Sequence, residues 1–419
     1  MNILLVHQNF PGQFKHLMPA LLAEPDHRVV AFSMREVPKI RGLQTVVYRP
    51  GRMSTKGIQP WVSDLETKVI RGEVAFKAAR KMRDEHGFAP DVIFSHHGWG
   101  ESMFLKEIWP RAKVLLYCEW YYPLQGADYD FDPEFSEDSE EARCRLRMKN
   151  AHNLLSLEMA DAGVSPTHWQ KSTHPDWFKP RIRVIHDGID TDRVAPSRAT
   201  AELRLPIPAD ADCGIAQGEV VLHREDEIVT FVNRNLEPYR GYHVFMRALP
   251  DLLRRRPKAR VEIVGGRDTS YGAKPDKGTW KQRFLDEVRA EIDFSRVFFV
   301  GNIPYGSFVP LLQMSTVHTY LTYPFVLSWS LMETMACGGA IVASDTEPVR
   351  EVITDGETGR LVNFFDRAAL VDRICELLDD PAQRARLGAQ AREFAVNHYD
   401  LRRICLPAQL SLLHELAAS

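Results

Sequence analysis

Residues 318–362 carry the most informative pattern in the chain, HTYLTYPFVLSWSLMETMACGGAIVASDTEPVREVITDGETGRLV. Its apolar first part pauses at Ser328-Trp329-Ser330 and continues into a predicted helix with one acid, Glu333. The pair Gly338-Gly339 then precedes a second apolar run. A carboxylate is costly to bury unless it has a partner. We therefore expect Glu333 either to face solvent or to hold another group.

The same alternation of apolar runs and helical stretches extends over the whole chain. In the first half it predicts strands over Ile3–Val6, Arg28–Phe32, Asp91–Ser95 and Lys113–Tyr117, with helices over 13–23, 64–86 and 140–160. In the second half it predicts strands over Glu227–Val232, Arg260–Val264, Val297–Val300, Val317–Leu321 and Ala340–Ala343, with helices near 241–255, 280–292, 306–313, 329–337 and 366–379. Nearly continuous apolar strands separated by helices indicate parallel sheets covered on both faces.

The pattern restarts after a connection within residues 178–226, which contains the loop-rich segment PSRATAELRLPIPADADCG. A chain of 419 residues also exceeds the roughly 250–300 residues at which single cores stop growing. The sequence therefore predicts an α/β protein with two doubly wound, Rossmann-like domains. Ligands of such sheets bind beyond the carboxyl ends of the strands, so we expect a site in the cleft between the domains.

Composition excludes several classes of function. A net charge of −3 gives no basic footprint for nucleic acid. The six cysteines form no CxxC pair and no Cys/His metal spacing, which is typical of reduced thiols in a cytoplasmic protein. The start MNILLVHQNF is predicted to be a strand, not a signal peptide. No segment approaches the roughly 18 apolar residues of a membrane span.

Three turns that follow predicted strands could bind an anion. Gly12 lies in the turn beyond the first strand, and Gly265 with Gly266 follows a strand of the second half. Arg234 and Arg240 flank another turn, and two guanidiniums there would suit a diphosphate. Each turn alone also fits a plain connection or a solvated surface arginine. Their order along the chain strengthens the functional interpretation.

This order resembles the family 4 glycosyltransferases, retaining enzymes with the GT-B fold. The resemblance covers nearly the whole chain and includes RIRVIHDGIDTDRV, Arg240-Gly241, VFFVG and SLMETMACGGAIVASDTEPVREVITDGETGRLV. It implies an acceptor-binding domain over 1–180, a nucleotide-sugar-binding domain over 181–400, and a last helix over 401–419 that packs back on the first domain. The amphipathic spacing of Leu406, Leu410 and Leu413 agrees with such a helix.

The resemblance also implies roles for the donor-site residues. Glu333 matches the family's second glutamate, which holds the ribose hydroxyls of the donor. Ser328 and Trp329 lie where helix-start amides face the diphosphate and the sugar. Segment 301–305 is the expected base pocket, with Asn302, Ile303 and Tyr305. The family's first glutamate is replaced by Phe325, so we expect the donor sugar to be oriented differently or to be a different sugar.

The first domain departs from the family in a second way. Where family members often have a His near the reaction centre, KVLLYCEWYYP has Cys118-Glu119. Glu119 could replace that polar group, or the pair could line an acceptor pocket or be structural. His96 and His97 follow a strand, and one of them could touch a sugar, with a structural histidine as the alternative. Trp120 could stack on a sugar or pack in the core.

The mechanism that the resemblance implies is sugar transfer from a nucleotide diphosphate with the anomeric configuration kept. Arg234, Arg240 and the helix start would stabilise the leaving diphosphate, and Glu119 and His96 complete the candidate catalytic set. Neither a metal nor another cofactor is then expected. Asp128, Asp130 and Asp132 of DYDFDPE superficially match a metal motif, but a solvated loop or lid in 128–143 is favoured.

The expected partners are a UDP- or GDP-sugar and a glycan, lipid-linked or small-molecule acceptor, in polysaccharide or glycoconjugate biosynthesis. We expect a cytoplasmic protein, with peripheral contact at the inner membrane face left open. Two alternatives remain: a GT-B enzyme with other chemistry, such as an epimerase, and a non-catalytic binder of sugar nucleotides. The donor nucleotide, the sugar, the acceptor, the linkage and the oligomeric state are not encoded in a readable pattern.

Overall fold

The computed structural model describes residues 1–137 and 139–419. It divides into two compact units, one formed by Met1–Gly188 with Leu401–Ser419 and the other by Ile189–Asp400. The first unit thus extends past the boundary at 180/181 that the sequence suggested, and it includes the C-terminal segment.

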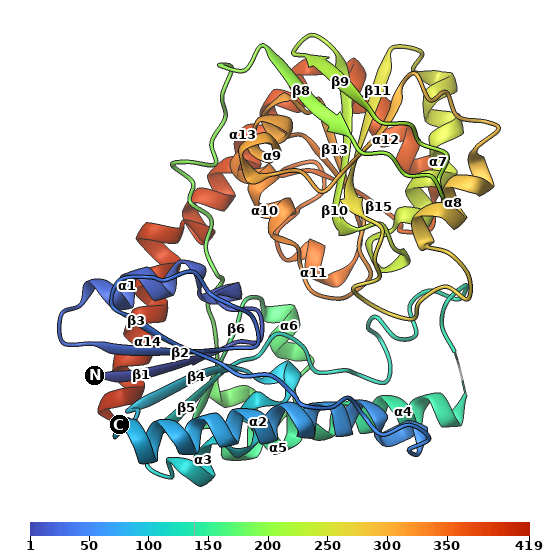
Figure 1. Ribbon diagram of the computed structural model, residues 1–419. Coiled ribbons are helices and arrows are strands. Elements are labelled where there is room, and N and C mark those ends of the chain that lie inside the picture. Colours follow the sequence, from blue (N-terminus) through green and yellow to red (C-terminus); the bar gives the residue numbers. More distant parts are fainter. Residues whose placement is uncertain (138) are drawn as a thin grey trace. The chain divides into compact units, whose positions relative to one another are not determined.

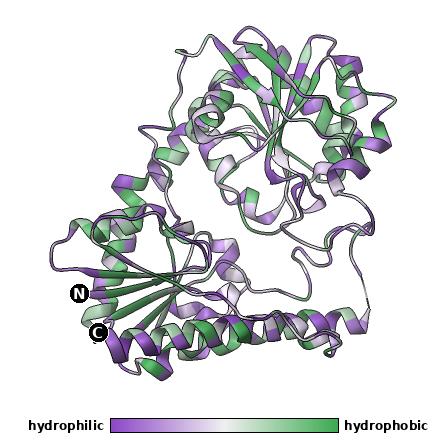
Figure 2. Ribbon diagram, viewed as in Figure 1, coloured by the Kyte–Doolittle hydropathy of each residue, from purple (hydrophilic) through white to green (hydrophobic). Residues whose placement is uncertain are grey.

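The N-terminal unit contains a parallel sheet of seven strands, where the sequence predicted four. Its order is β3-β2-β1-β4-β5-β6-β7. The strands are β1 (Asn2–Val6), β2 (Arg28–Ser33), β3 (Leu43–Val47), β4 (Val92–His96), β5 (Lys113–Tyr117), β6 (Ala162–Ser165) and β7 (Ile182–Val184). Figure 2 shows these strands mostly in green, as expected for a sheet that is buried on both faces.

Helices cover both faces of this sheet (Figure 1). They are α1 (Leu17–Ala23), α2 (Ser63–His86), α3 (Leu105–Ile108), α4 (Glu140–Lys149), α5 (Ala151–Met159), α6 (His168–Ser172) and α14 (Leu406–Ala418). Ile3 of β1 belongs to the apolar cluster that contains Leu17 and Leu413, whereas its neighbour Leu4 belongs to the cluster with Met82 and Leu157. Alternate side chains of one strand therefore build two separate cores.

The helix predicted over 140–160 is two helices in the structure. Asn150 ends α4, and its side-chain amide donates to the Tyr122 carbonyl at 2.7 Å. The same side chain accepts from the Tyr122 amide at 3.0 Å. This reciprocal pair ties the junction between α4 and α5 to the segment after β5.

Helix α14 belongs to the N-terminal unit. A π-helical turn over Leu401–Cys405 leads into it, and α14 contacts α1, β4 and β5. Leu413 is fully buried there and Leu412 nearly so. Figure 1 shows this helix in red beside the blue strands that open the chain.

The C-terminal unit contains a parallel sheet of six strands in the order β12-β11-β10-β13-β14-β15, and a two-stranded antiparallel hairpin. The six are β10 (Glu227–Asn235), β11 (Ala259–Gly266), β12 (Val297–Gly301), β13 (Val317–Tyr320), β14 (Ile341–Ser344) and β15 (Arg360–Val362), and the hairpin is β8 (Glu202–Ile207) with β9 (Gly218–His223). The hairpin lies in the segment predicted to be loop-rich. Its Leu205 and Leu222 are fully buried in the core of this unit.

The helices of this unit follow the strands in alternation. They are α7 (Tyr242–Arg255), α8 (Trp280–Val288), α9 (Tyr305–Met314), α10 (Trp329–Ala336), α11 (Glu347–Arg350), α12 (Arg367–Asp379) and α13 (Pro381–Tyr399). The predicted α/β class with two Rossmann-like parallel sheets is confirmed. Among the described residues, no helix has both the length and the apolar character to cross a membrane.

Candidate active site

The acid that stands out in the sequence, Glu333, lies on α10 and is only 6% exposed. The Tyr305 hydroxyl, at the start of α9, donates to Glu333 Oε1 at 2.8 Å. Burial, together with the nearby Glu333 carboxylate, raises the pKa of Tyr305 well above its ordinary value. The carboxylate therefore has a partner, and the pair joins the predicted ribose ligand to a residue of the predicted base pocket.

The start of α10 is held by hydroxyl groups. Ser328 caps the helix by accepting from the Ser330 amide at 3.3 Å. Its own amide donates to the Tyr320 hydroxyl at 2.9 Å, which ties the helix start to the end of β13. Helix α10 has eight residues, so its amide dipoles leave partial positive charge at Ser328 and Trp329.

Arg234 and Arg240 differ in their surroundings. Arg234 lies near the carboxyl end of β10 and is exposed. Arg240 is buried, and its Nη1 donates to Thr322 Oγ1 and to the Val326 carbonyl, each at 2.9 Å. The sequence predicted two guanidiniums acting alike on a diphosphate. The structure instead gives Arg240 a fixed place against the segment between β13 and α10, so this residue positions the start of α10.

Sequence reasoning missed Glu237, which lies between these two arginines. Its side chain is fully buried, and Oε2 accepts from the Ser270 and Tyr271 amides at 2.8 and 3.0 Å. Burial raises the pKa of Glu237 to about 7, against the opposing effect of the two amides and of Arg240 and Arg234. The signal was present in NLEPYRG, where an acid precedes the turn that carries Arg240.

The two glycines that end β11, Gly265 and Gly266, allow the segment after β10 to approach closely. A Cβ on Gly265 would lie 2.8 Å from Leu236 Cδ2, and one on Gly266 would lie 2.5 Å from Asn235 Oδ1. The Leu236 amide also donates to the Gly266 carbonyl at 3.0 Å. Of the other predicted base-pocket residues, Asn302 is exposed and Ile303 partly buried in the segment after β12.

Phe325, which replaces the family's first glutamate, is 4% exposed. Its ring lies 4.9 Å from that of Tyr271 and 5.4 Å from that of Tyr239. The structure therefore places this residue in an aromatic cluster beside the Glu237-bound loop, and it does not present the ring as an open surface for a sugar.

In the N-terminal unit, a polar network joins the carboxyl ends of β1, β4 and β5. His7 Nδ1 accepts from the Asn9 amide, so Nε2 carries the proton and donates to Gln13 Oε1 at 2.6 Å. Gln13 Nε2 then donates to Glu119 Oε1 at 3.1 Å, and Glu119 Oε2 lies 3.3 Å from His96 Nε2. Predicted residues Glu119 and His96 are thus brought together through two residues that the sequence did not single out.

The protons of this network can be placed from the same contacts. His96 Nδ1 accepts from the Gly98 amide at 3.1 Å, which leaves its Nε2 as the N–H that faces Glu119. Burial lowers the pKa of His7 to about 3. His7 directly follows β1, as His96 directly follows the strand predicted over Asp91–Ser95, so the sequence did contain a signal for it.

Gly12 has a structural reason to be glycine. Its φ of +49° is in the left-handed region, and a Cβ there would lie 2.2 Å from the His7 ring. The turn after β1 can therefore place Gln13 against His7 only because position 12 has no side chain.

Two predicted acceptor contacts are enclosed by the N-terminal unit. His97 is fully buried, with Nδ1 2.8 Å from Asn153 Oδ1. Trp120 is 5% exposed, and its ring lies 6.2 Å from that of Trp169. For Trp120 the core-packing alternative therefore describes the structure, and neither side chain is presented at the surface.

The segment DYDFDPE is less solvated than the sequence suggested. Asp128 and Asp132 are buried, at 4% and 3% exposed. Asp130 is exposed and accepts from the Gly126 and Ala127 amides in a turn. The remainder of the predicted loop includes residue 138, which lies outside the described residues.

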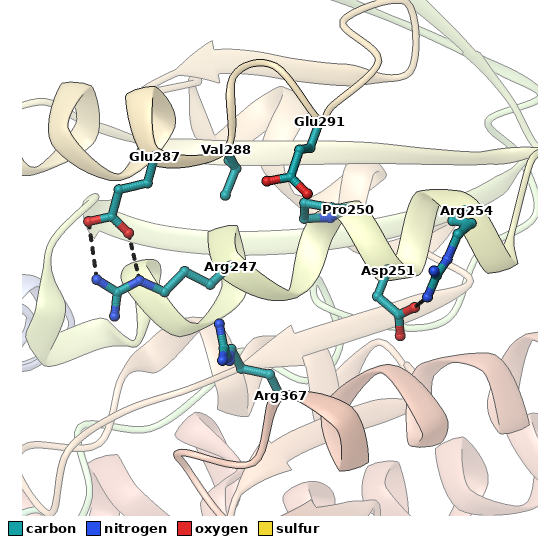
Figure 3. A pocket seen from close by; sticks show the side chains of 8 residues that line it. All are labelled: Arg247, Pro250, Asp251, Arg254, Glu287, Val288, Glu291 and Arg367. Carbon is teal, nitrogen blue, oxygen red and sulfur yellow. Dashed lines mark hydrogen bonds and ion pairs between the residues drawn. The ribbon is translucent and has the colours of Figure 1, made fainter.

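A hollow of about 630 Å³ lies elsewhere in the C-terminal unit, between α7 and α8 (Figure 3). Its charged groups pair with one another, as Arg247 does with Glu287 through bonds of 2.6 and 3.1 Å. Its lining residues lie on α7 and α8, just after α8 and at the start of α12, and they include none of the predicted site residues. It is not the candidate site.

Replacing Glu237 by Gln should remove a pH dependence of stability. The pKa in the folded protein, about 7, is above the ordinary value of 4.5, so folding favours the protonated form. That contribution is fully present below pH 4.5 and is lost as the pH rises through 7. Glu237→Gln should therefore gain about 3 kcal/mol relative to the native protein between pH 4.5 and pH 8.

Urea unfolding of both proteins across this pH range tests the expectation. Glu262→Gln is the matched control, because burial raises the pKa of that carboxyl to about 8 as well, at a site within β11. Its stability curve should keep the loss of stability that Glu237 causes between pH 4.5 and pH 7. Parallel curves for Glu237→Gln and the native protein would show that the carboxyl does not titrate there.

Two family models match the chain. The Glycosyl transferase family 4 group matches residues 25–194 and the Glycosyl transferases group 1 matches residues 216–394. The D-inositol 3-phosphate glycosyltransferase of Corynebacterium efficiens is 26% identical over 321 residues, which cover 74% of this chain and 68% of that protein. The phosphatidyl-myo-inositol mannosyltransferase of Mycolicibacterium smegmatis is 31% identical over 267 residues, which cover 59% and 64%.

Solved structures agree on the fold. Sucrose-phosphate synthase from Thermosynechococcus elongatus superposes with a TM-score of 0.71 at 19% identity, covering 100% of both chains. The Anabaena protein HepE superposes with a TM-score of 0.66 at 16% identity, covering 99% of this chain and 100% of the other. The resemblance stated from the sequence is confirmed: residues 25–194 belong to the Glycosyl transferase family 4 group and residues 216–394 to the Glycosyl transferases group 1, and the chain is a glycosyltransferase.

Proposed function

We propose that the protein is a retaining, metal-independent glycosyltransferase. It transfers a sugar from a nucleotide diphosphate sugar to an acceptor hydroxyl, in polysaccharide or glycoconjugate biosynthesis. The observation that carries the proposal is the pairing of Glu333 with Tyr305 at 2.8 Å, where Glu333 belongs to the helix whose start is capped by Ser328. A carboxylate beside an aromatic ring suits a nucleoside, and an amide-rich helix start suits its phosphates.

In this proposal, different residues of the C-terminal unit bind different parts of the donor. Glu333 accepts from the ribose hydroxyls, and the positive end of the α10 dipole, at Ser328 and Trp329, attracts the diphosphate. Arg234, exposed near the end of β10, neutralises the charge that develops on the leaving diphosphate. Arg240 keeps the segment between β13 and α10 in place through Thr322 and Val326. Cationic stabilisation of this kind removes the need for a catalytic metal ion.

The His96–Glu119 pair is the proposed polar centre of the N-terminal unit. Glu119 is part of a network through Gln13 to His7, so its carboxylate is held in one orientation. A fixed carboxylate of this kind can accept a hydrogen bond from a sugar or acceptor hydroxyl. Retention of the anomeric configuration is tested by the coupling constant of the anomeric proton in the product.

The donor is proposed to be a UDP- or GDP-sugar. HepE was solved with UDP-glucose, and a relative from Mycolicibacterium smegmatis is named as GDP-mannose-dependent. Names of the relatives refer to inositol phosphate and to phosphatidylinositol acceptors, so both a small-molecule and a lipid-linked acceptor belong in the screen. The proposed setting is the cytoplasm, at the inner membrane face for a lipid-linked acceptor.

A nucleotide panel tests the donor class. UDP, GDP, ADP and dTDP are compared by thermal shift and calorimetry, with and without brief exposure to EDTA. A ligand that binds only the folded protein raises its stability by RT ln(1 + [L]/Kd). We expect one nucleotide to stabilise selectively and independently of EDTA. Binding without release of free nucleotide diphosphate in the presence of acceptors would favour the non-catalytic alternative.

Removing the Glu333 carboxylate should weaken nucleotide diphosphate binding about 10- to 100-fold, as expected for loss of charge-assisted bonds to two hydroxyls. Glu333→Gln is measured by calorimetry against Glu291→Gln, which alters an exposed acid of the hollow between α7 and α8. Tyr305→Phe should have a smaller effect, because it removes only the bond that orients the carboxylate. Equal dissociation constants for the Glu333 and Glu291 variants would exclude the assignment.

A further inference from the structure

Three potential metal ligands meet inside the N-terminal unit. His97 follows β4, Cys118 follows β5, and His174 lies just beyond α6. Their ligand atoms all lie within 4.8 Å of one another. His97 and Cys118 are 0% exposed and His174 is 2% exposed. In sequence the three are far apart, so no motif spacing could indicate the cluster.

The proton of His97 can be placed from a chain of hydrogen bonds. His97 Nδ1 lies 2.8 Å from Asn153 Oδ1. The orientation of Asn153 is set because its Nδ2 donates to Asn150 Oδ1 at 3.3 Å. Asn150 is in turn fixed by Tyr122, whose amide donates to Oδ1 and whose carbonyl accepts from Nδ2. Asn153 therefore presents an acceptor, and His97 Nδ1 must carry the hydrogen.

The same reasoning applies to His174. Its Nδ1 lies 2.9 Å from the Gln170 carbonyl oxygen, which can only accept, so Nδ1 carries the hydrogen here as well. In the neutral rings both Nε2 atoms then have a lone pair, and these two atoms lie 3.4 Å apart. Two facing lone pairs repel unless one ring holds a buried positive charge or a cation lies between them, and an isolated buried charge is costly.

We propose that His97 Nε2, His174 Nε2 and Cys118 Sγ bind a zinc ion. Two imidazoles and a thiolate are a ligand set that zinc takes in tetrahedral geometry with a fourth position left over. Binding replaces the Cys118 thiol proton, which is released to solvent, and the thiolate then neutralises one of the two charges of the ion. The Asn153 amide oxygen and the Gln170 carbonyl orient the rings, as outer partners of metal-binding histidines do.

The position of the cluster suggests what the ion would do. His97 and Cys118 are the chain neighbours of His96 and Glu119, which face each other at 3.3 Å. An ion held by His97 and Cys118 would fix the backbone at the ends of β4 and β5, and so the separation of His96 from Glu119. It takes no part in the transfer step, and the proposed function does not depend on it.

The first test is the metal content of the untagged, full-length protein purified without chelators. Mass spectrometry of the elements should find about one zinc per chain, because a buried Cys/His set binds zinc tightly. Protein loaded with Co²⁺ in place of zinc should show a thiolate-to-cobalt charge-transfer band. Metal-free protein from zinc-supplemented cultures, with no such band after Co²⁺ loading, would overturn the proposal.

Variants identify the ligands. Cys118→Ser and His174→Gln should lower the zinc content at least about tenfold, as expected when a ligand of a zinc site is lost. Cys213→Ser, which alters a buried cysteine of the other unit, should retain both zinc and the cobalt band. Zinc kept by Cys118→Ser would overturn the assignment, and if that variant does not fold, the measurements on the native protein decide. None of these readouts depends on nucleotide binding, so failure here is distinct from failure of the proposed function.

Discussion

Arg234→Ala is expected to lower kcat/KM about 100- to 1,000-fold, because one preorganised donor lost from developing charge costs about 3–4 kcal/mol. The side chain is exposed near the end of β10, so the free energy of unfolding should change by no more than about 0.5 kcal/mol. Steady-state kinetics with the donor found in the nucleotide panel, together with urea unfolding, measure both effects.

The control for this variant is Arg254→Ala, which removes another exposed arginine from α7, beside the hollow between α7 and α8. Its kcat/KM should equal that of the native protein. Arg234→Lys should recover only part of the activity, because an ammonium group retains the charge but not the planar fork. Native kcat/KM in Arg234→Ala would remove Arg234 from the mechanism.

Gly388→Ala is expected to lower the free energy of unfolding by about 3 kcal/mol or more. Gly388 lies on α13, and a Cβ there would be 2.1 Å from the carbonyl oxygen of Gly338, which follows α10. Gly338 has a φ of +70°, a conformation suited to glycine at a helix end. The new Cβ is fixed to the backbone of α13, and the oxygen belongs to the backbone of Gly338. Neither group can turn away, so α10 and α13 must separate.

Urea unfolding compares this variant with Gly306→Ala on α9, where a Cβ would meet nothing within 4 Å. The control should be as stable as the native protein or up to about 1 kcal/mol more stable, since alanine restricts the unfolded chain. Because α10 carries Glu333, Gly388→Ala should also bind nucleotide more weakly. An unchanged unfolding midpoint would show that α10 and α13 can move apart freely.

The central strands of both sheets could be predicted because they are nearly continuous apolar runs between helical stretches, whereas β3, β6, β7 and β15 are short or contain polar residues and were not predicted. The hairpin β8–β9 escaped prediction because Pro206 and Pro208 interrupt its alternating pattern, and prolines are typical of loops. The break at Asn150 escaped because both flanking segments have helical character. It depends on a bond to Tyr122, which is remote in sequence.

Site residues were predictable where position after a strand was sufficient. Glu119 and His96 were found in this way, whereas Glu333 and Ser328 were identified through the resemblance, and the structure places Glu333 in contact with Tyr305. The burial of Arg240 was not predictable, because it depends on Thr322 and Val326. His96 and His97 show the same limit, since adjacent residues of one strand end face different surroundings.

The return of α14 to the N-terminal unit has a consequence for biosynthesis. Leu412 and Leu413 complete the core that contains Ile3 and Leu17, yet the ribosome makes them only after residues 189–400. The nascent N-terminal unit therefore cannot complete this apolar core until α14 has been synthesised, whereas the C-terminal unit has its whole sequence available earlier. Maturation of the two units is thus expected to run against the order of translation, and chaperones would meet the exposed side of the first sheet.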